Sequence, residues 1–235
     1  MSTPAVLRLT GVRKPYNALR PLRINDLTIA PGERVALSGL DAGAAEVLVN
    51  LVTGASVPDE GTVRVNGEDT AAIADGDEWL ASLDRFGIVS PRAVLLDAVT
   101  LLQNLAMPLT LQIDPVPPAA VATARAMARE TGIGEAWLER PVAGLPADVK
   151  MRAHLARAVM LAPSLLVLEH PTASLDKGQG QSFGDAVARV AGARSLAALI
   201  ISEDDEFAAA AASRRLTLQA ASGELKPRRR GFFGW

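Results

Sequence analysis

The chain has 235 residues, of which 49% are hydrophobic, so it is long and apolar enough to form a substantial core, and intrinsic disorder is excluded. A net charge of −2 provides no general attraction for nucleic acid, and we expect no nucleic-acid partner. The absence of cysteine excludes disulfides and thiolate sites, and two histidines are too few for a multi-histidine metal site. No apolar run approaches the roughly 20 residues that span a bilayer, so we expect a protein of the cytoplasm.

The first third of the chain predicts strands and one helix. Alternating or continuous apolar residues predict strands at 7–12, 22–29, 34–38 and 62–65. Apolar residues at helical spacing predict a helix that begins near Ala44 and ends at Val52.

The remainder predicts three helices and two buried strands. The helices are expected at 98–111, 119–131 and 147–161, and the strands at 165–168 and 197–201. Strands that alternate with helices are typical of an α/β fold with a parallel sheet.

The C-terminal end differs in composition from the rest of the chain. Four cations lie close together, namely Lys226, Arg228, Arg229 and Arg230, and residues 231–235 contain three aromatic side chains. We therefore divide the chain into a domain at residues 1–225 and a basic-aromatic tail at 226–235. The tail is interpreted as a solvated end, a contact with an anionic membrane surface or a permease, or a nucleic-acid arm.

The segment after the third predicted strand has the outline of a phosphate-binding loop. Such a loop needs glycines to wrap the phosphates, a lysine beside them and a hydroxyl residue for Mg²⁺. Gly39 and Gly43 are present, but the second glycine of the motif is Ala44, the lysine is Ala45 and the hydroxyl residue is Glu46. As an isolated motif this segment carries no functional weight.

Several residues and short motifs further along the chain follow a known order and spacing. They are Gly54, Pro58-Asp59-Glu60-Gly61, Gly67, Thr100, Asn104, Pro163, Leu165–Asp176 and Ile201–Asp204. Together they resemble the nucleotide-binding subunit of an ABC transporter over roughly residues 6–223. The resemblance implies a P-loop NTPase-like, RecA-like α/β core with an N-terminal antiparallel β layer and a helical subdomain at about 97–158.

The resemblance also identifies the catalytic positions and shows that they differ from the family. Walker B ends in Asp-Glu in the family, where the Asp serves Mg²⁺ and the Glu polarises water, but Glu169 and His170 stand there. The Q-loop glutamine falls on Pro91 or the adjacent Ser90, and the switch histidine falls on Glu203.

Other positions that bind nucleotide in the family are altered as well. The signature loop, Leu-Ser-Gly-Gly-Gln in the family, is represented by Leu145, Pro146, Ala147, Asp148 and Val149. The D-loop aspartate is retained as Asp176, and Tyr16 is the candidate aromatic for stacking on adenine.

These substitutions oppose the binding of ATP and Mg²⁺, the cofactors that the family implies. Loss of a lysine and gain of a glutamate near the phosphates each cost roughly 1 to 4 kcal/mol. We expect neither cofactor to bind tightly and no metal site. We further predict that Asp41 caps the helix 42–52 and that its carboxylate fills the place of a phosphate.

The preferred interpretation is a degenerate ABC cassette that serves as a structural or regulatory partner of a membrane permease, at the inner face of the membrane, with little or no ATP hydrolysis. It could pair with a second cassette, identical or different. The alternatives are a divergent but active transport ATPase, using Glu169, His170 and Lys150, and an adaptor that binds membrane or protein without a permease.

Overall fold

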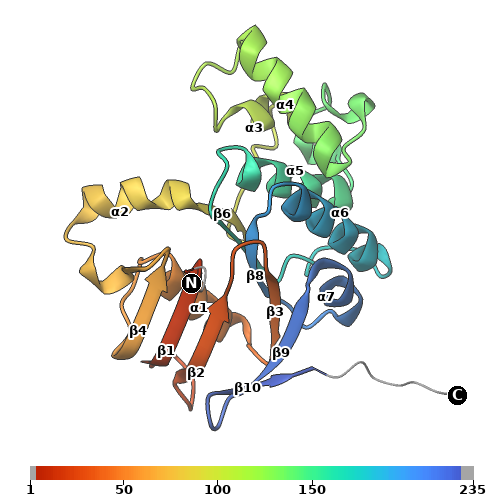
Figure 1. Cartoon of the computed structure of the whole chain (residues 1–235). Helices are drawn as coiled ribbons and strands as arrows, with labels where there is room; N and C mark the ends of the chain where they lie inside the picture. Colours follow the sequence, from red (N-terminus) through yellow and green to blue (C-terminus); the bar gives the residue numbers. More distant parts are fainter. Residues whose placement is uncertain (1–3, 229–235) are drawn as a thin grey trace, which may run out of the picture.

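A computed structural model describes residues 4–228, which form two β-sheets and a group of helices (Figure 1). The strands are β1 (Leu7–Lys14), β2 (Leu22–Ile29), β3 (Arg34–Ser38), β4 (Glu60–Val65), β5 (Glu68–Asp69), β6 (Phe86–Val89), β7 (Leu165–Glu169), β8 (Ala197–Ile201), β9 (Arg214–Gln219) and β10 (Glu224–Pro227). The helices are α1 (Ala42–Val52), α2 (Gly76–Ser82), α3 (Leu101–Ala106), α4 (Pro118–Thr131), α5 (Ala147–Val159), α6 (Gln179–Ala193) and α7 (Asp205–Ala211).

The larger sheet has the strand order β10-β9-β3-β8-β7-β6. Its strands are parallel except for β10, which pairs antiparallel with β9. All residues of β7 and β8 are buried, which explains why these strands are continuous apolar runs. The parallel α/β core expected from the sequence is confirmed, and the carboxyl ends of β3, β7 and β8 lie at one edge of the sheet.

The smaller sheet, β2-β1-β4-β5, is antiparallel and is formed by the N-terminal part of the chain. Helix α1 belongs to the core between the two sheets: Leu48 and Leu51 share one cluster of buried side chains with Leu9 of β1 and Val35 of β3. The phosphate-loop segment at the start of α1 is thus fixed by packing on both sides.

Helices α3, α4 and α5 form a separate group at one end of the molecule (Figure 1). Helix α3 is shorter than the predicted range 98–111. Thr100 begins it with a capping box, in which its hydroxyl accepts from the Gln103 N–H and the Gln103 side chain accepts from the Thr100 N–H. The helix ends before Pro108, whose ring cannot continue it.

The last strand extends beyond the boundary that the sequence suggested at residue 225. Lys226 and Pro227 pair with Thr217 and Leu216 of β9, so they belong to the sheet. The remaining tail, including Arg229 and Arg230, lies outside the described residues. Within residues 4–228, the structure contains no helix with the length and apolar character needed to cross a membrane.

Candidate functional site

The loop between β3 and α1 is held by two carboxylates of the protein itself. Gly39 has a positive φ of 85°, and its N–H donates to Oε1 of Glu203, which follows β8, at 2.6 Å. Asp41 is the N-cap of α1, as predicted, and its Oδ1 accepts from the Ala44 N–H at 2.7 Å. Two N–H groups of the loop therefore already donate to anionic oxygens.

Tyr16 packs directly on this loop. Its hydroxyl donates to Oδ2 of Asp41 at 3.4 Å, and a Cβ added to Gly43 would lie 3.1 Å from two of its ring carbons. Burial, followed by the charge and hydrogen bond of Asp41, raises the pKa of Tyr16. The ring therefore covers the phosphate loop, and its role in stacking on adenine stays a prediction.

Glu169, at the end of β7, is buried and held by three hydrogen bonds. The Ser90 hydroxyl donates to its Oε2 at 2.8 Å, and the Arg92 guanidinium donates to Oε1 at 3.1 Å and to Oε2 at 2.8 Å. Arg92 also lies 3.4 Å from Oε1 of Glu46 on α1. One guanidinium thus joins the two carboxylates that the sequence places at the Mg²⁺ positions of P-loop proteins.

Arg92 is the residue that sequence reasoning missed. Of the two candidates for the Q-loop position, Ser90 turns its hydroxyl to Glu169, whereas Pro91 lines a neighbouring cavity. Arg92 lies two residues beyond Ser90 on the segment that leaves β6. The sequence held one clue to its role: Arg92 follows the expected Q-loop position, and glutamates, Glu46 and Glu169, stand at both positions expected to hold Mg²⁺.

Several groups of this arrangement are unfavourable to ATP and Mg²⁺. The N–H groups of Gly39 and Ala44 donate to Glu203 and Asp41, and Arg92 joins Glu46 and Glu169, the residues that the sequence places at the metal positions. Ala45, which the sequence places where the phosphate-binding lysine would stand, is fully buried. Two carboxylates on the loop N–H groups and two on the Arg92 guanidinium place four acidic groups against a single cation, and this excess of negative charge repels a polyphosphate. Among residues 4–228, no group of three or more His, Asp and Glu side chains is arranged to hold a metal ion.

His170, the candidate surrogate base, has an unusual backbone. Its φ is 42°, and its Nε2 is buried with no hydrogen-bond partner among the described residues. His170, Ser174 and His154 line a cavity of about 260 Å³ beside Ser90. Burial, and secondarily the charge of Arg157, lowers the pKa of His154. No contact seen here gives His170 a catalytic partner within the described chain.

The signature positions belong to the helical group. Leu145 and Val149 are buried in its core, Pro146 and Ala147 begin α5, and Asp148 lies in the first turn. Among residues 4–228, no hydrogen bond or ion pair joins positions 145–149 to the phosphate loop.

Two further residues have local contacts. The N–H of Asp176 donates to the side chain of Gln179 at the start of α6. The Lys150 ammonium donates to the Ala143 carbonyl within the helical group, at 3.4 Å. Neither contact reaches the phosphate loop.

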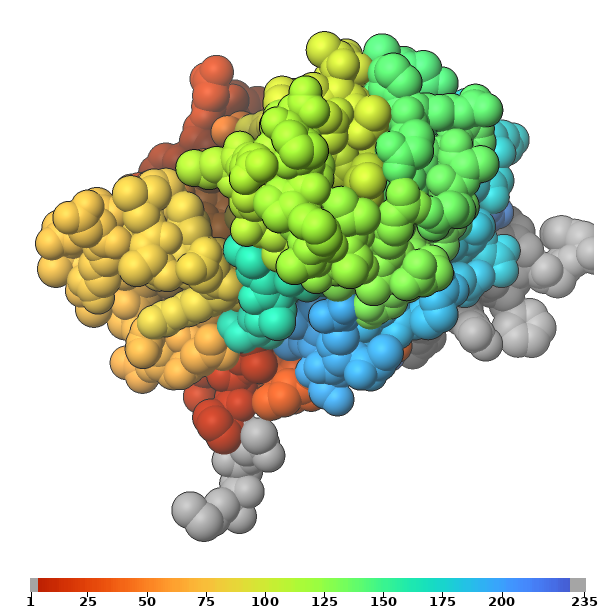
Figure 2. Space-filling model, turned by 90° about the horizontal axis from the view of Figure 1, so that it is seen from above, coloured from red at the N-terminus to blue at the C-terminus, as the bar shows by residue number. Residues whose placement is uncertain are grey.

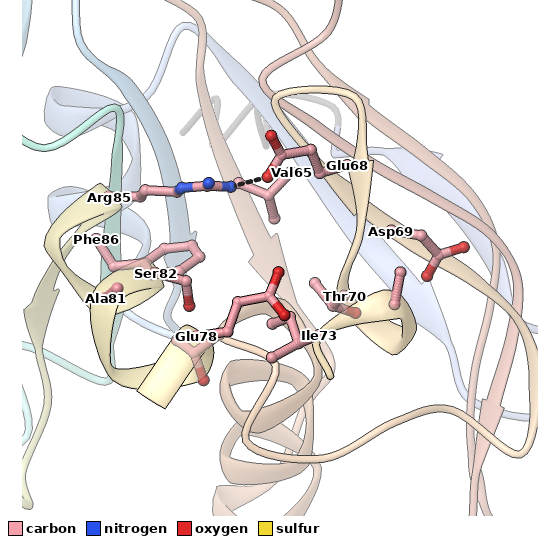
Figure 3. A pocket seen from close by; sticks show the side chains of 12 residues that line it. Val65, Glu68, Asp69, Thr70, Ile73, Glu78, Ala81, Ser82, Arg85 and Phe86 are labelled. Carbon is pink, nitrogen blue, oxygen red and sulfur yellow. Dashed lines mark hydrogen bonds and ion pairs between the residues drawn. The ribbon is translucent and has the colours of Figure 1, made fainter. Parts of the chain in front are cut away.

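A second cavity, of about 340 Å³, lies between the β4–β5 hairpin and α2 (Figure 3). Arg85 pairs with Glu68 at its wall, Asp69 accepts from the Ala71 N–H, and Glu78 accepts from the Ala74 N–H. These charged groups therefore stabilise the local chain, and we assign the cavity no ligand.

Comparison with known proteins agrees with the arrangement of the motifs. Residues 22–173 match the family model described as ABC transporter. The chain is 30% identical to the lipoprotein-releasing system ATP-binding protein LolD of Pseudomonas syringae pv. tomato, over 87% of this chain and 91% of that protein. It is 27% identical to the Fe(3+) ions import ATP-binding protein FbpC of Serratia marcescens, over 85% of this chain and 56% of the relative.

Solved structures of cassettes share the fold. The dimeric ATP-binding cassette MJ0796, bound to ADP and Pi, has a TM-score of 0.75 at 21% identity, covering 96% of this chain and all of that one. CbiO1 of Clostridium perfringens, part of the transporter complex cbiONQ, has a TM-score of 0.78 at 18% identity, covering 94% and 86%. This chain therefore belongs to the ABC transporter family and has the P-loop NTPase fold of its ATP-binding cassettes.

Proposed function

We propose that this chain is the cassette subunit of a transporter complex, in which it supports or regulates a membrane permease with little or no ATP hydrolysis. The observation that carries the proposal is the bridge from Arg92 to Glu46 and Glu169, because it occupies the positions where the family binds Mg²⁺. The carboxylates of Asp41 and Glu203 on the phosphate loop support it further.

Pairing with a second cassette does not restore a complete site. In the family each nucleotide lies between the phosphate loop of one cassette and the signature of another, and both elements are altered in this chain. Neither a pair of identical chains nor a pair with an intact cassette therefore contains a complete nucleotide site to which this chain contributes. The proposal includes pairing of this chain with a second cassette, which is either identical to it or different.

The permease is proposed to dock in a groove between the α2 region and the helical group. The groove encloses about 330 Å³, and its lining includes Phe86, Pro108, His154, Arg157 and Leu161. Figure 2 shows the projecting α2 region beside the helical group, with the end of α5 between them. The exposed side chain of Leu161 offers apolar surface to a partner at this edge.

We infer that the permease, and not a lipid contact, holds the chain at the inner face of the membrane. Lys226 lies 3.5 Å from Glu224, and Arg228 lies 2.7 Å from Asp205. Two of the four cations that suggested binding to anionic lipid therefore have acidic partners.

Two measurements on the full chain test the proposal. Phosphate release from ATP by the purified protein should show no Mg²⁺-dependent rate; a clear rate would favour a divergent ATPase. Affinity capture from solubilised membranes, read by mass spectrometry, should recover a multi-span permease subunit. Leu161→Glu should abolish this capture, whereas Leu111→Glu, at a fully exposed position outside the groove, should not. Capture that is equal for both variants, or recovers no permease, contradicts the proposal.

A further inference from the structure

The segment that leaves β6 and enters α3 is attached to the sheet and the helices by polar contacts at several points. Ser90 donates to Glu169 at its start, and the Arg157 guanidinium donates to the Val94 carbonyl at 2.8 Å. The side chain of the fully buried Asn104 accepts from the Leu96 N–H at 2.8 Å and donates to the Leu96 carbonyl at 3.0 Å. We call residues 90–97 the connecting segment.

Arg92 joins this connecting segment to two other elements. Its guanidinium binds both oxygens of Glu169 at the end of β7 and approaches Glu46 in the first half of α1. A planar guanidinium is suited to such a two-point contact, and a charge-assisted bond to a buried carboxylate is stronger than a neutral one. Three elements far apart in sequence thus meet at a single cation.

In P-loop proteins a Mg²⁺ ion joins the same two elements, the start of the helix after the loop and the end of another strand of the parallel sheet. That ion arrives and leaves with the nucleotide. The cation here is covalently attached to the connecting segment, so its contacts need no ligand.

We propose that Arg92 is a built-in cation that fastens the connecting segment, and with it the entrance to the helical group, to the sheet without nucleotide. Arg92 is a positioning residue: it acts through Glu46 and Glu169 on the conformation of residues 90–97. The inference depends only on contacts within this chain and stands apart from the proposed partnership with a permease.

Removal of Arg92 leaves Glu46 and Glu169 without their shared cation. A divalent ion of hard character prefers carboxylate and hydroxyl oxygens, which Glu46, Glu169 and Ser90 then supply. The Arg92→Ala variant should therefore respond to Mn²⁺ in a way that the parent chain does not.

The test is amide hydrogen exchange of the purified full chain, resolved at Ala93 and Leu96, whose N–H groups donate to the Ser90 carbonyl and the Asn104 side chain. Arg92→Ala should speed exchange at both by about tenfold or more, the factor that corresponds to 1.4 kcal/mol. Millimolar Mn²⁺ should restore protection in this variant and leave the parent unchanged.

Arg85→Ala is the control, because Arg85 has a similar exposed fraction, 39% against 43%, and pairs with an acidic residue, Glu68, away from the connecting segment. It should leave exchange at Ala93 and Leu96 unchanged. Arg92→Lys keeps the charge and should give an intermediate rate, which preserves the test if Arg92→Ala does not fold. Unchanged exchange in Arg92→Lys and in a folded Arg92→Ala, or equal effects of the Arg85 and Arg92 variants, would overturn the proposal.

Discussion

Two arginines with nearly the same exposure hold acids in very different surroundings. Arg92 binds Glu169, whose side chain is 3% exposed, whereas Arg85 binds Glu68, whose side chain is 68% exposed. An exposed pair is worth little because water screens it, but a buried carboxylate that loses its partner is left uncompensated. The stability of the phosphate-loop region therefore depends strongly on its internal ion pairs, whereas the stability of the α2 region depends on them much less.

Replacing each arginine in turn should give the largest difference between the two regions. Arg92→Ala should lower the free energy of unfolding by about 3 kcal/mol, the lower end for a broken buried pair, because Arg92 itself is partly exposed. Arg85→Ala should cost at most about 1 kcal/mol. Urea denaturation of both variants measures the difference, and equal losses would contradict this account.

A second substitution in each variant tests whether the unpaired carboxylate causes the loss of stability. In the Arg92→Ala background, Glu169→Gln should recover about half of the lost stability or more, since it removes the stranded charge and keeps a group that Ser90 can contact. Glu68→Gln in the Arg85→Ala background should recover little. The measurement is a double-mutant cycle for each pair, and a coupling near zero for Arg92 and Glu169 is the opposing result.

The cap of α1 tests the second contact of the region. Asp41→Ala should cost about 1 kcal/mol because the Ala44 N–H loses its acceptor. Asp41→Asn keeps an acceptor and should cost a few tenths of that amount. Thermal denaturation measures both. Equal losses for the two variants would show that the N-cap hydrogen bond is not the source of the effect.

The smallest effect concerns pH. Burial, and then Arg157, lowers the pKa of His154, so the folded state binds this proton less readily than the unfolded state does. Its contribution to stability is present above the unfolded pKa of about 6.5 and is lost as pH falls through the lower, folded pKa. His154→Gln should reduce the decrease in unfolding free energy on acidification below pH 6.5. An unchanged pH profile would contradict the assignment.

The frame of the fold could be predicted from the sequence because it depends on local patterns. The apolar runs of β7 and β8 and the Asp41 cap were identified from neighbouring residues alone. Strand β6 was missed since it has only four residues and includes Gly87, and β9 was missed since it begins with two arginines.

The candidate site was only partly predictable for a different reason. Arg92 and Glu169 are separated by 77 residues, and Gly39 and Glu203 by 164. A sequence shows which charges exist, but the sheet order determines which of them meet. The sequence therefore showed the departures from the family motifs and the Asp41 cap, but not the contact of Arg92 with Glu169 or that of Glu203 with Gly39.

The most direct test of the account is calorimetric titration of the purified full chain with ATP and Mg²⁺ up to millimolar concentration. The account predicts no Mg²⁺-dependent binding, because Asp41 and Glu203 accept from two N–H groups of the loop and Arg92 pairs with Glu46 and Glu169. Micromolar binding that requires Mg²⁺ would contradict it.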